Sequence, residues 1–222
     1  MTKKKELKPL AVSCGTADCE NKLHCFHKSK RLSAAQKDNW ARGLCVYCGA
    51  DKIDWTRLRR RDPQDAKNTI VSLRNEWIRN HYWEKELTER VIGNARRCGR
   101  AAIEQRVERR IESAVGKPKH LNSWDGRQTP FKGKAETIIT MGQHAMACCC
   151  RTCMLKWHGI PTDLPLSPEE IEYFKKLVLL FIDARMPKLN PQPEKIAPHR
   201  VPKPLAKPPE QTSLPFEHVV GV

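Results

Sequence analysis

Cysteine and histidine gather in two stretches of this sequence, and the denser stretch constrains the fold more than any other feature. Residues 143–160 hold four cysteines and two histidines. Thiolate and imidazole are the ligands that tetrahedral zinc prefers, and a Cys-x-x-Cys pair brings two sulfurs to one ion from a single turn. The pair Cys150 and Cys153 therefore predicts a zinc site, with Cys149 as a competing ligand. We expect four residues to close it: His144, Cys150, Cys153 and His158.

The same stretch carries a family resemblance. Gln-His-Ala, then Cys-Cys-Arg-x-Cys, then Trp-His-Gly-Ile-Pro together resemble the signature of a bacterial family of small proteins whose function is unassigned. The similarity covers about residues 125–185. Cys148 departs from the signature, which has a Thr or another small polar residue there. The resemblance implies a fold and no activity, and the residues that match it are His144, Cys149, Cys150, Cys153 and His158.

A second cluster lies within residues 14–48. Its last pair, Cys45 and Cys48, has the short spacing and the following glycine of a zinc knuckle. We therefore predict a closed structural site with four sulfur ligands, Cys14, Cys19, Cys45 and Cys48. Three further residues lie between the pairs and could replace a cysteine of the first pair: His24, Cys25 and His27. The sequence thus predicts two zinc ions in each chain.

The knuckle also resembles the metal-binding half of the His-Asn-His nuclease family. Members of that family carry an Asp-His pair after the first knuckle, in which the histidine activates water. Here Asp51 and Asp54 follow Cys48, but the next histidine is His81. The nuclease interpretation therefore lacks its general base and is kept only as an alternative.

The start of the chain bears on the state of the cysteines. Residues 1–12 are basic and contain no apolar run long enough for a secretion signal. No stretch of the sequence approaches the length of a membrane span. We therefore expect a cytoplasmic protein that makes no membrane contact and whose cysteines are reduced, free to bind metal rather than paired in disulfides.

The charge of the chain points to a polyanionic partner. Forty-one Lys and Arg stand against 25 Asp and Glu, which gives a formal net charge of +16. Nucleic acids are the most abundant intracellular polyanions, so we expect contact with DNA or RNA, with a solvated basic surface as the alternative. Glutamates interleaved with the later arginines equally fit ion pairing on a helix surface. The predicted contacts are Arg57, Arg59, Arg60, Arg61, Arg96, Arg97 and Arg100.

Apolar periodicity predicts a mostly α fold with small zinc-bound β or turn elements. Apolar residues at three- and four-residue steps indicate helices over residues 70–81 and 87–111, with a break at Gly99. Ser167, followed by Pro and two Glu, predicts a capped helix that Pro187 ends. Residues 136–140 are the one strand candidate.

Composition divides the chain into four predicted segments. They are a zinc-knuckle segment at 1–62, a helical region at 63–116, a metal-binding turn with the last helix at 117–186, and a disordered tail at 187–222. Nine of the sixteen prolines fall in the tail, so it cannot bury a core. Residues 211–216 resemble the peptide by which bacterial DNA-processing proteins dock into the sliding clamp, although Thr212 departs from the usual Leu. The resemblance implies a partner site at Gln211, Leu214 and Phe216.

Three functions remain open at this stage. The leading one is a zinc-stabilised protein that binds nucleic acid, because four ligands saturate zinc and make it structural. The first alternative is a zinc-dependent nuclease or other hydrolase, in which water replaces a histidine that does not reach the ion. The second is an adaptor that recruits a protein partner through its tail. Enzymatic activity is left open, although closed sites argue against it.

Overall fold

The computed structural model describes residues 12–29, 31–121, 129, 133 and 135–197. Over these residues regular structure is helical, and β pairing is limited to two isolated bridges, which join Asp18 to Leu23 and His24 to Glu76. The mostly helical fold is confirmed. The predicted β elements amount to these bridges and to turns. None of the described helices has both the length and the apolar character needed to cross a lipid bilayer.

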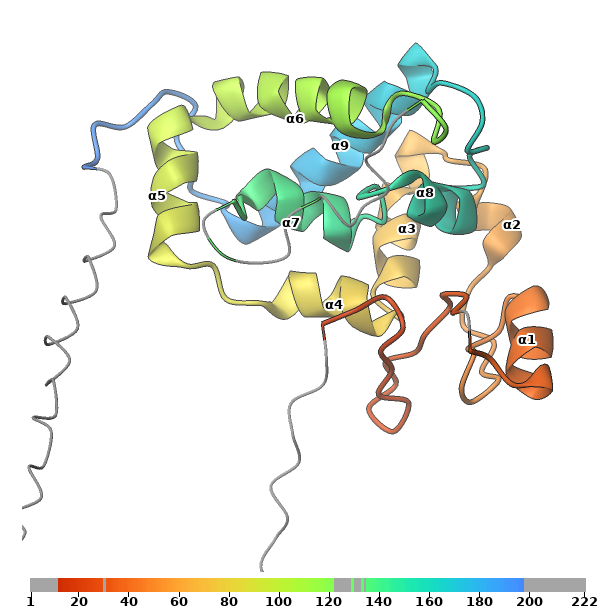
Figure 1. Ribbon diagram of the computed structural model, residues 1–222. Coiled ribbons are helices and arrows are strands. Elements are labelled where there is room, and N and C mark those ends of the chain that lie inside the picture. The colour runs from red at the N-terminus through yellow and green to blue at the C-terminus, as the bar shows by residue number, and fades with distance from the viewer. Residues whose placement is uncertain (1–11, 30, 122–128, 130–132, 134, 198–222) are drawn as a thin grey trace, which may run out of the picture.

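The helices divide into an N-terminal pair and a larger body (Figure 1). The N-terminal elements are α1 (Ala34–Ala41), α2 (Trp55–Leu58) and the short 3-10 helix η1 (Pro63–Asp65). The body consists of α3 (Ala66–Leu73), α4 (Trp77–Glu84), α5 (Glu89–Cys98), α6 (Arg100–Val115), α7 (Ile138–Ala145), α8 (Arg151–His158) and α9 (Pro168–Arg185). One hydrophobic core extends from Phe26 to Ile182, through three of the four predicted segments. The boundaries between those segments stay predictions.

Helix α9 forms the middle of the body, where it packs against α6 and α7. Its predicted capping box is confirmed, since the Ser167 hydroxyl accepts from the Glu170 N–H and the Glu170 carboxylate accepts from the Ser167 N–H. The helix ends at Arg185, two residues before Pro187. Its buried apolar side chains each contribute about 1.5–3 kcal/mol to folding, which makes α9 the main support of the core.

Glycine permits two close approaches in this body. At Gly142 in α7, an added Cβ would lie 3.0 Å from Val178 Cγ1 on α9, so the two helices could not pack as closely with a larger residue. Gly99 separates α5 from α6, as predicted, with a φ of +73°. A Cβ there would lie 2.6 Å from the carbonyl carbon of Gln192, because the chain after α9 passes over this corner.

The predicted strand at residues 136–140 was wrong, because a helix begins there. Thr137 caps α7 in a capping box with Thr140. The neighbouring β-branched residues suggested a strand, but Ile138, Met141 and Ala145 follow at helical spacing and are all buried. Burial against α4 and α9 therefore outweighs the local β propensity.

The first part of the predicted disordered tail is ordered against α5. The Glu194 carboxylate forms an ion pair with Arg96 at 2.5 Å, and the Glu194 N–H donates to the Arg96 carbonyl at 3.0 Å. Arg97 donates to the carbonyl of Ala197 at 3.1 Å. The prolines do prevent a helix here, but the extended chain still docks. The proposed clamp-binding residues Gln211, Leu214 and Phe216 lie outside the described residues.

Candidate metal centres and an adjoining cleft

The N-terminal cluster consists of Cys19, His24, Cys45 and Cys48. One ligand atom from each lies within 4.8 Å of all the others. The sulfurs of Cys19 and Cys45 are 3.7 Å apart, and Cys48 Sγ lies 3.4 Å from His24 Nδ1. Three thiols and one imidazole are a donor set that suits zinc. His24, which the sequence offered only as a substitute, takes the place that was predicted for Cys14.

Two turns bring the ligands of the N-terminal cluster together. Asp18 and Leu23 exchange backbone hydrogen bonds of 2.7 and 2.9 Å, and this pairing sets Cys19 beside His24. In the knuckle, the Gly49 N–H donates to the Cys45 carbonyl at 2.9 Å, and Gly49 has a φ of +71°. Burial acts to raise the pKa of Cys45, but backbone hydrogen bonds lower it overall, so the turn favours the thiolate that binds metal.

Backbone hydrogen bonds of His24 fix the N-terminal cluster to the helical body. Its N–H donates to the Asn75 carbonyl at 2.8 Å, and its carbonyl accepts from the Trp77 N–H at 2.9 Å, where α4 begins. Burial, helped by the charge of Lys52, lowers the pKa of the ring. The ring is therefore neutral at pH 7, which is the form that coordinates a metal.

The second cluster lies in the core of the molecule and includes Cys149, Cys150 and Cys153. All three are buried, and their sulfurs lie within 4.8 Å of one another. Cys150 is the N-cap residue of α8, and its sulfur accepts from the Cys153 N–H at 3.4 Å. The sulfurs of Cys149 and Cys153 are 3.7 Å apart. The helix start thus turns sulfurs of neighbouring residues toward one point.

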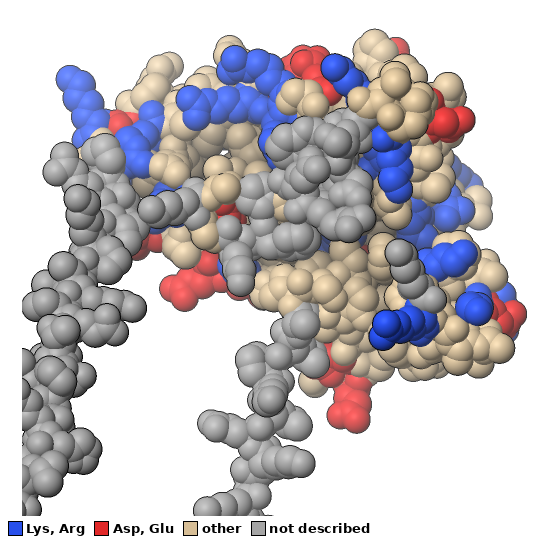
Figure 2. Space-filling model, in the orientation of Figure 1, with Lys and Arg blue, Asp and Glu red and all other residues tan. Residues whose placement is uncertain are grey.

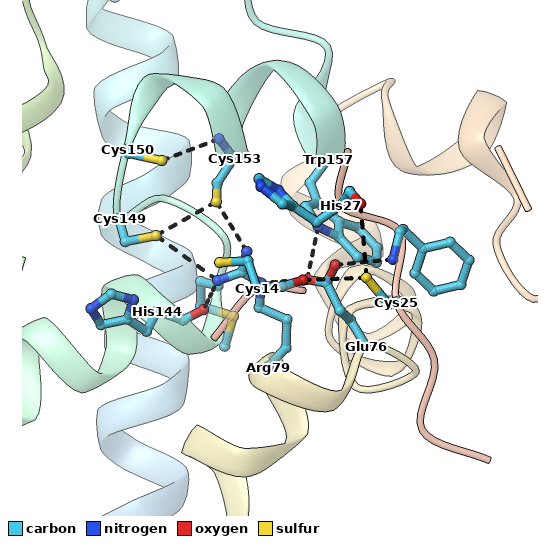
Figure 3. Close-up of polar contacts among 12 residues, drawn as sticks. Cys14, Cys25, His27, Glu76, Arg79, His144, Cys149, Cys150, Cys153 and Trp157 are labelled. Atoms are coloured by element: carbon cyan, nitrogen blue, oxygen red, sulfur yellow. Dashed lines mark hydrogen bonds and ion pairs between the residues drawn. The ribbon is translucent and has the colours of Figure 1, made fainter. Parts of the chain in front are cut away.

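Cys14 brings a further sulfur to the edge of this group, from the far end of the chain. Its thiol hydrogen-bonds the sulfur of Cys153, and Figure 3 shows its side chain between α8 and Arg79. Its carbonyl accepts from the buried thiol of Cys25 at 3.3 Å, which holds the N-terminal segment in place. We call Cys14, Cys149, Cys150 and Cys153 the core cluster. The predicted partners of Cys14, by contrast, all lie in the N-terminal cluster.

The two predicted histidine ligands are used elsewhere. His158 Nε2 lies 3.0 Å from the Met146 carbonyl and Nδ1 lies 3.2 Å from the Tyr173 hydroxyl, so both ring nitrogens are engaged. Burial lowers the pKa of His158 to about 4, so the ring is neutral at pH 7. His144 Nε2 lies 3.2 Å from the Thr129 carbonyl, and the ring stacks on Tyr82. Both histidines support packing around the cluster instead of completing it.

A buried ion pair, Arg79 with Glu76, borders the core cluster (Figure 3). Each side chain is 1% exposed, and Arg79 Nε donates to Glu76 Oε2 at 2.9 Å. The guanidinium also donates to Cys153 Sγ at 3.0 Å and to the His144 carbonyl at 2.6 Å. Its charge lies beside the sulfurs, where a thiolate cluster needs compensation.

The Glu76 carboxylate also accepts hydrogen bonds from outside this ion pair. It accepts from Trp157 Nε1 at 3.2 Å and from the Phe26 N–H at 3.3 Å. Burial raises the pKa of Glu76, while the Arg79 charge opposes this rise. For Arg79, burial acts to lower the pKa, but the charges of Cys153 and Glu76 raise it well above its usual value. The pair thus connects the N-terminal segment, α4 and α8 around the sulfurs.

The spacing of the sulfurs favours a metal over disulfides. A tetrahedral zinc ion with bonds of about 2.3 Å places its sulfur ligands about 3.8 Å apart, whereas a disulfide brings them to about 2.05 Å. One sulfur pair in each cluster lies 3.7 Å apart. All ten cysteines are unpaired. Both donor sets therefore fit a thiophilic metal ion.

The predicted nucleic-acid contacts do not share one surface. Figure 1 places α2, next to the first four arginines, and α5, next to the last three, at opposite ends of the molecule. Three of the seven form ion pairs with carboxylates: Arg57 with Asp65, Arg96 with Glu194, and Arg100 with Asp183. Three donate to backbone carbonyls: Arg59, Arg61 and Arg97. Arg60 is exposed.

A cleft of about 660 Å³ opens among the segment after His24, α1, α2 and α8. Trp40 and Trp55 both line it, and none of the described residues around it is acidic. The basic side chains that line it are Lys28, Arg42, Arg59 and Lys156. Their convergence depends on the tertiary fold.

The fold and the two clusters together define the class of protein: it is mostly helical over the described residues and has two Cys/His clusters that suit metal ions. The chain belongs to the family described as Domain of unknown function (DUF4186), whose family model matches residues 67–183, just over half of the sequence. The predicted membership of a family of unassigned function is confirmed at this level, while the individual motif positions stay predictions. No solved structure matches the chain.

The region that matches the family model contains the three buried cysteines of the core cluster and none of the N-terminal cluster. It also includes Glu76 and Arg79. Cys14 and the whole N-terminal cluster precede it. The core cluster is therefore completed by a residue from outside the matched region.

Proposed function

We propose that the two clusters hold zinc ions and that these ions shape a nucleic-acid-binding protein. The observation that carries this proposal is the position of the cleft, whose walls are fixed by both clusters. His27, Lys28 and residues 40–43, which form one wall, lie between the ligands His24 and Cys45. Helix α8, which forms another, begins at Cys150 and carries Lys156.

The donor sets support zinc in a structural role. The N-terminal cluster offers three thiols and an imidazole, and the core cluster offers three thiols within 4.8 Å of one another, with Cys14 hydrogen-bonded to one of them, Cys153. In the N-terminal cluster, four protein donors would fill a tetrahedral ion and leave no position for water, so this cluster gives the hydrolase alternative no support. When bound, zinc would cross-link segments that are distant in the sequence.

Charge supports the nucleic-acid partner. The chain carries a formal net charge of +16, and Figure 2 shows Lys and Arg side chains spread over the face in view, with fewer acidic ones among them. The arginines predicted from the sequence are mostly engaged within the protein, and Arg59 is the one of the seven that lines the cleft, so we assign the contact to the cleft. The adaptor function rests on tail residues outside the described ones and stays a prediction.

Metal analysis and a binding titration test this function. Protein purified without chelators under reducing conditions should contain two zinc ions per chain by plasma mass spectrometry. A metal-free protein with an unchanged circular dichroism spectrum would overturn the zinc proposal. Labelled oligonucleotides should bind in an anisotropy titration, with affinity that falls by roughly a thousandfold between about 50 and 200 mM salt if about six phosphates are contacted. Absence of binding at low salt would overturn the nucleic-acid proposal.

A further inference from the structure

The cleft between the two clusters combines aromatic rings with unneutralised positive charge. Lys156 Nζ lies 4.5 Å from the centre of the Trp55 ring and 5.3 Å from that of Trp40. Lys28 Nζ lies 4.6 Å from the Trp40 ring centre, and Arg59 Cζ lies 5.1 Å from the Trp55 ring centre. Three cations are thus held over two tryptophans from three different segments of the chain.

No carboxylate of the described residues forms an ion pair with these cations. Among the described residues, Lys28, Arg59 and Lys156 form no ion pair with an acidic side chain, and no acidic residue lines the cleft. Burial, followed by the charge of Arg59, lowers the pKa of Lys156 to about 8. Such a shift reflects positive charge that is crowded and poorly solvated. An anion in the cleft would relieve that crowding.

We propose that the cleft binds an unpaired base and its phosphate in a single-stranded nucleic acid. Trp40 provides the stacking surface, and Lys28, Arg59 and Lys156 contact the phosphate. This inference rests on the proposed nucleic-acid function and adds the site and the strand form. The cleft, at about 660 Å³, lies within the roughly 300–1,000 Å³ of small-molecule sites.

The chemistry of the cleft favours a single strand over a duplex. A base in a duplex has both faces covered by its neighbours, whereas an unpaired base exposes a face that can stack on an indole ring. The cations that now lie over the rings are on long, flexible side chains. They can therefore exchange a ring face for a phosphate oxygen when a base takes their place.

Trp40 can be tested more cleanly than Trp55. Trp55 contacts Phe26 and Trp157 at ring-centre distances of 5.8 and 5.2 Å, and its indole N–H donates to the Gly43 carbonyl, so it supports the core. Trp40 lies on α1, a helix with no buried residue. Trp83 does not line the cleft and packs against Phe181 at a ring-centre distance of 5.1 Å, so Trp83→Ala controls for a general loss of tryptophan packing.

The test uses the full, zinc-loaded chain and fluorescein-labelled oligothymidylate, oligouridylate and a DNA duplex of equal length. The single strands should bind at least tenfold more tightly than the duplex. Trp40→Ala should weaken single-strand binding by roughly 5- to 150-fold, the loss expected for one stacked base. Trp40→Tyr should restore most of it, and Trp83→Ala should leave it unchanged. The two single strands distinguish DNA from RNA as the source.

The outcomes separate this inference from the function on which it rests. If no nucleic acid binds, the proposed function and the inference fall together. If the duplex binds as tightly as the single strands, or Trp40→Ala binds like the wild type, the function stands and the assignment of the cleft is overturned. Lys28→Gln provides a second variant on an exposed residue, and unchanged affinity in both variants would also overturn the assignment.

Discussion

The two clusters contrast in how they are built. The N-terminal cluster takes all its ligands from residues 19–48, and its Cys48 is exposed. The core cluster has three fully buried cysteines near the start of α8 and a fourth, Cys14, from the opposite end of the chain. A buried ion pair compensates charge beside the core cluster, whereas the N-terminal cluster relies on backbone hydrogen bonds in its turns.

The two clusters should therefore differ in whether they can bind metal before the helical body has folded. A local cluster of closely spaced ligands can bind metal before the body has folded, as small zinc modules do. The core cluster can form only when α4, α8 and the N-terminal segment are already together. Metal in the core cluster should therefore be coupled to global stability, and metal in the N-terminal cluster to local order.

The largest effect should come from Cys153→Ser. This substitution removes the sulfur that contacts Cys14, Cys149 and Arg79, so the buried guanidinium loses one of its acceptors. We expect one zinc ion per chain and a free energy of unfolding lowered by more than about 4 kcal/mol. Metal analysis and urea unfolding measure the two quantities. Two ions in the variant would contradict the assignment of the core cluster.

The next effect concerns the buried ion pair. Arg79→Met keeps the side-chain length but leaves the Glu76 carboxylate buried without its cation, which should lower stability by about 3–5 kcal/mol. The double variant with Glu76→Gln should recover part of this loss, because the uncompensated charge is gone. Urea unfolding of the four proteins completes the cycle. Additive losses would show that the two side chains act independently.

Acid should destabilise the core through His158. Its pKa lies at about 4 in the folded protein because of burial, against about 6.5 in an unfolded chain. The unfolded state therefore binds the proton first, and stability is lost as pH falls from about 6.5 toward 4, by up to about 3 kcal/mol. His158→Gln keeps a donor and an acceptor but does not titrate. The difference between the two proteins should shrink with acid, and a constant difference would contradict a neutral buried ring.

Local features of both clusters could be predicted from the sequence. Spacing indicated the knuckle at Cys45 and Cys48 and the sulfurs near Cys150 and Cys153, because ligands on one turn are close in any fold. The capping box at Ser167 predicted the start of α9 for the same reason. Each of these inferences depends on contacts between residues fewer than six positions apart.

Long-range placement could not be predicted from spacing. Cys14 was assigned to its neighbour Cys19, although the fold carries it to Cys153. His158 resembled a ligand because a buried histidine with two hydrogen-bond partners has no distinct local pattern. Glu76 and Arg79 have the i, i+3 spacing that is also typical of surface ion pairs on a helix. The available signal that Arg79 faces inward was its place beside Ile78 and three residues before Tyr82, both of which are buried.

The smallest effect on global stability should come from Cys48→Ser. This variant gives the most direct test of the difference between the N-terminal cluster and the core cluster. Cys48 is exposed and holds only the N-terminal cluster, so its loss should release one zinc ion and lower the free energy of unfolding by less than about 2 kcal/mol. The helical circular dichroism signal should persist. Nucleic-acid binding should nevertheless weaken, because Lys28 and Trp40, which line the cleft, lie between ligands of that cluster in the sequence. A variant that loses its helical body as completely as Cys153→Ser would show that the two clusters are one folding unit.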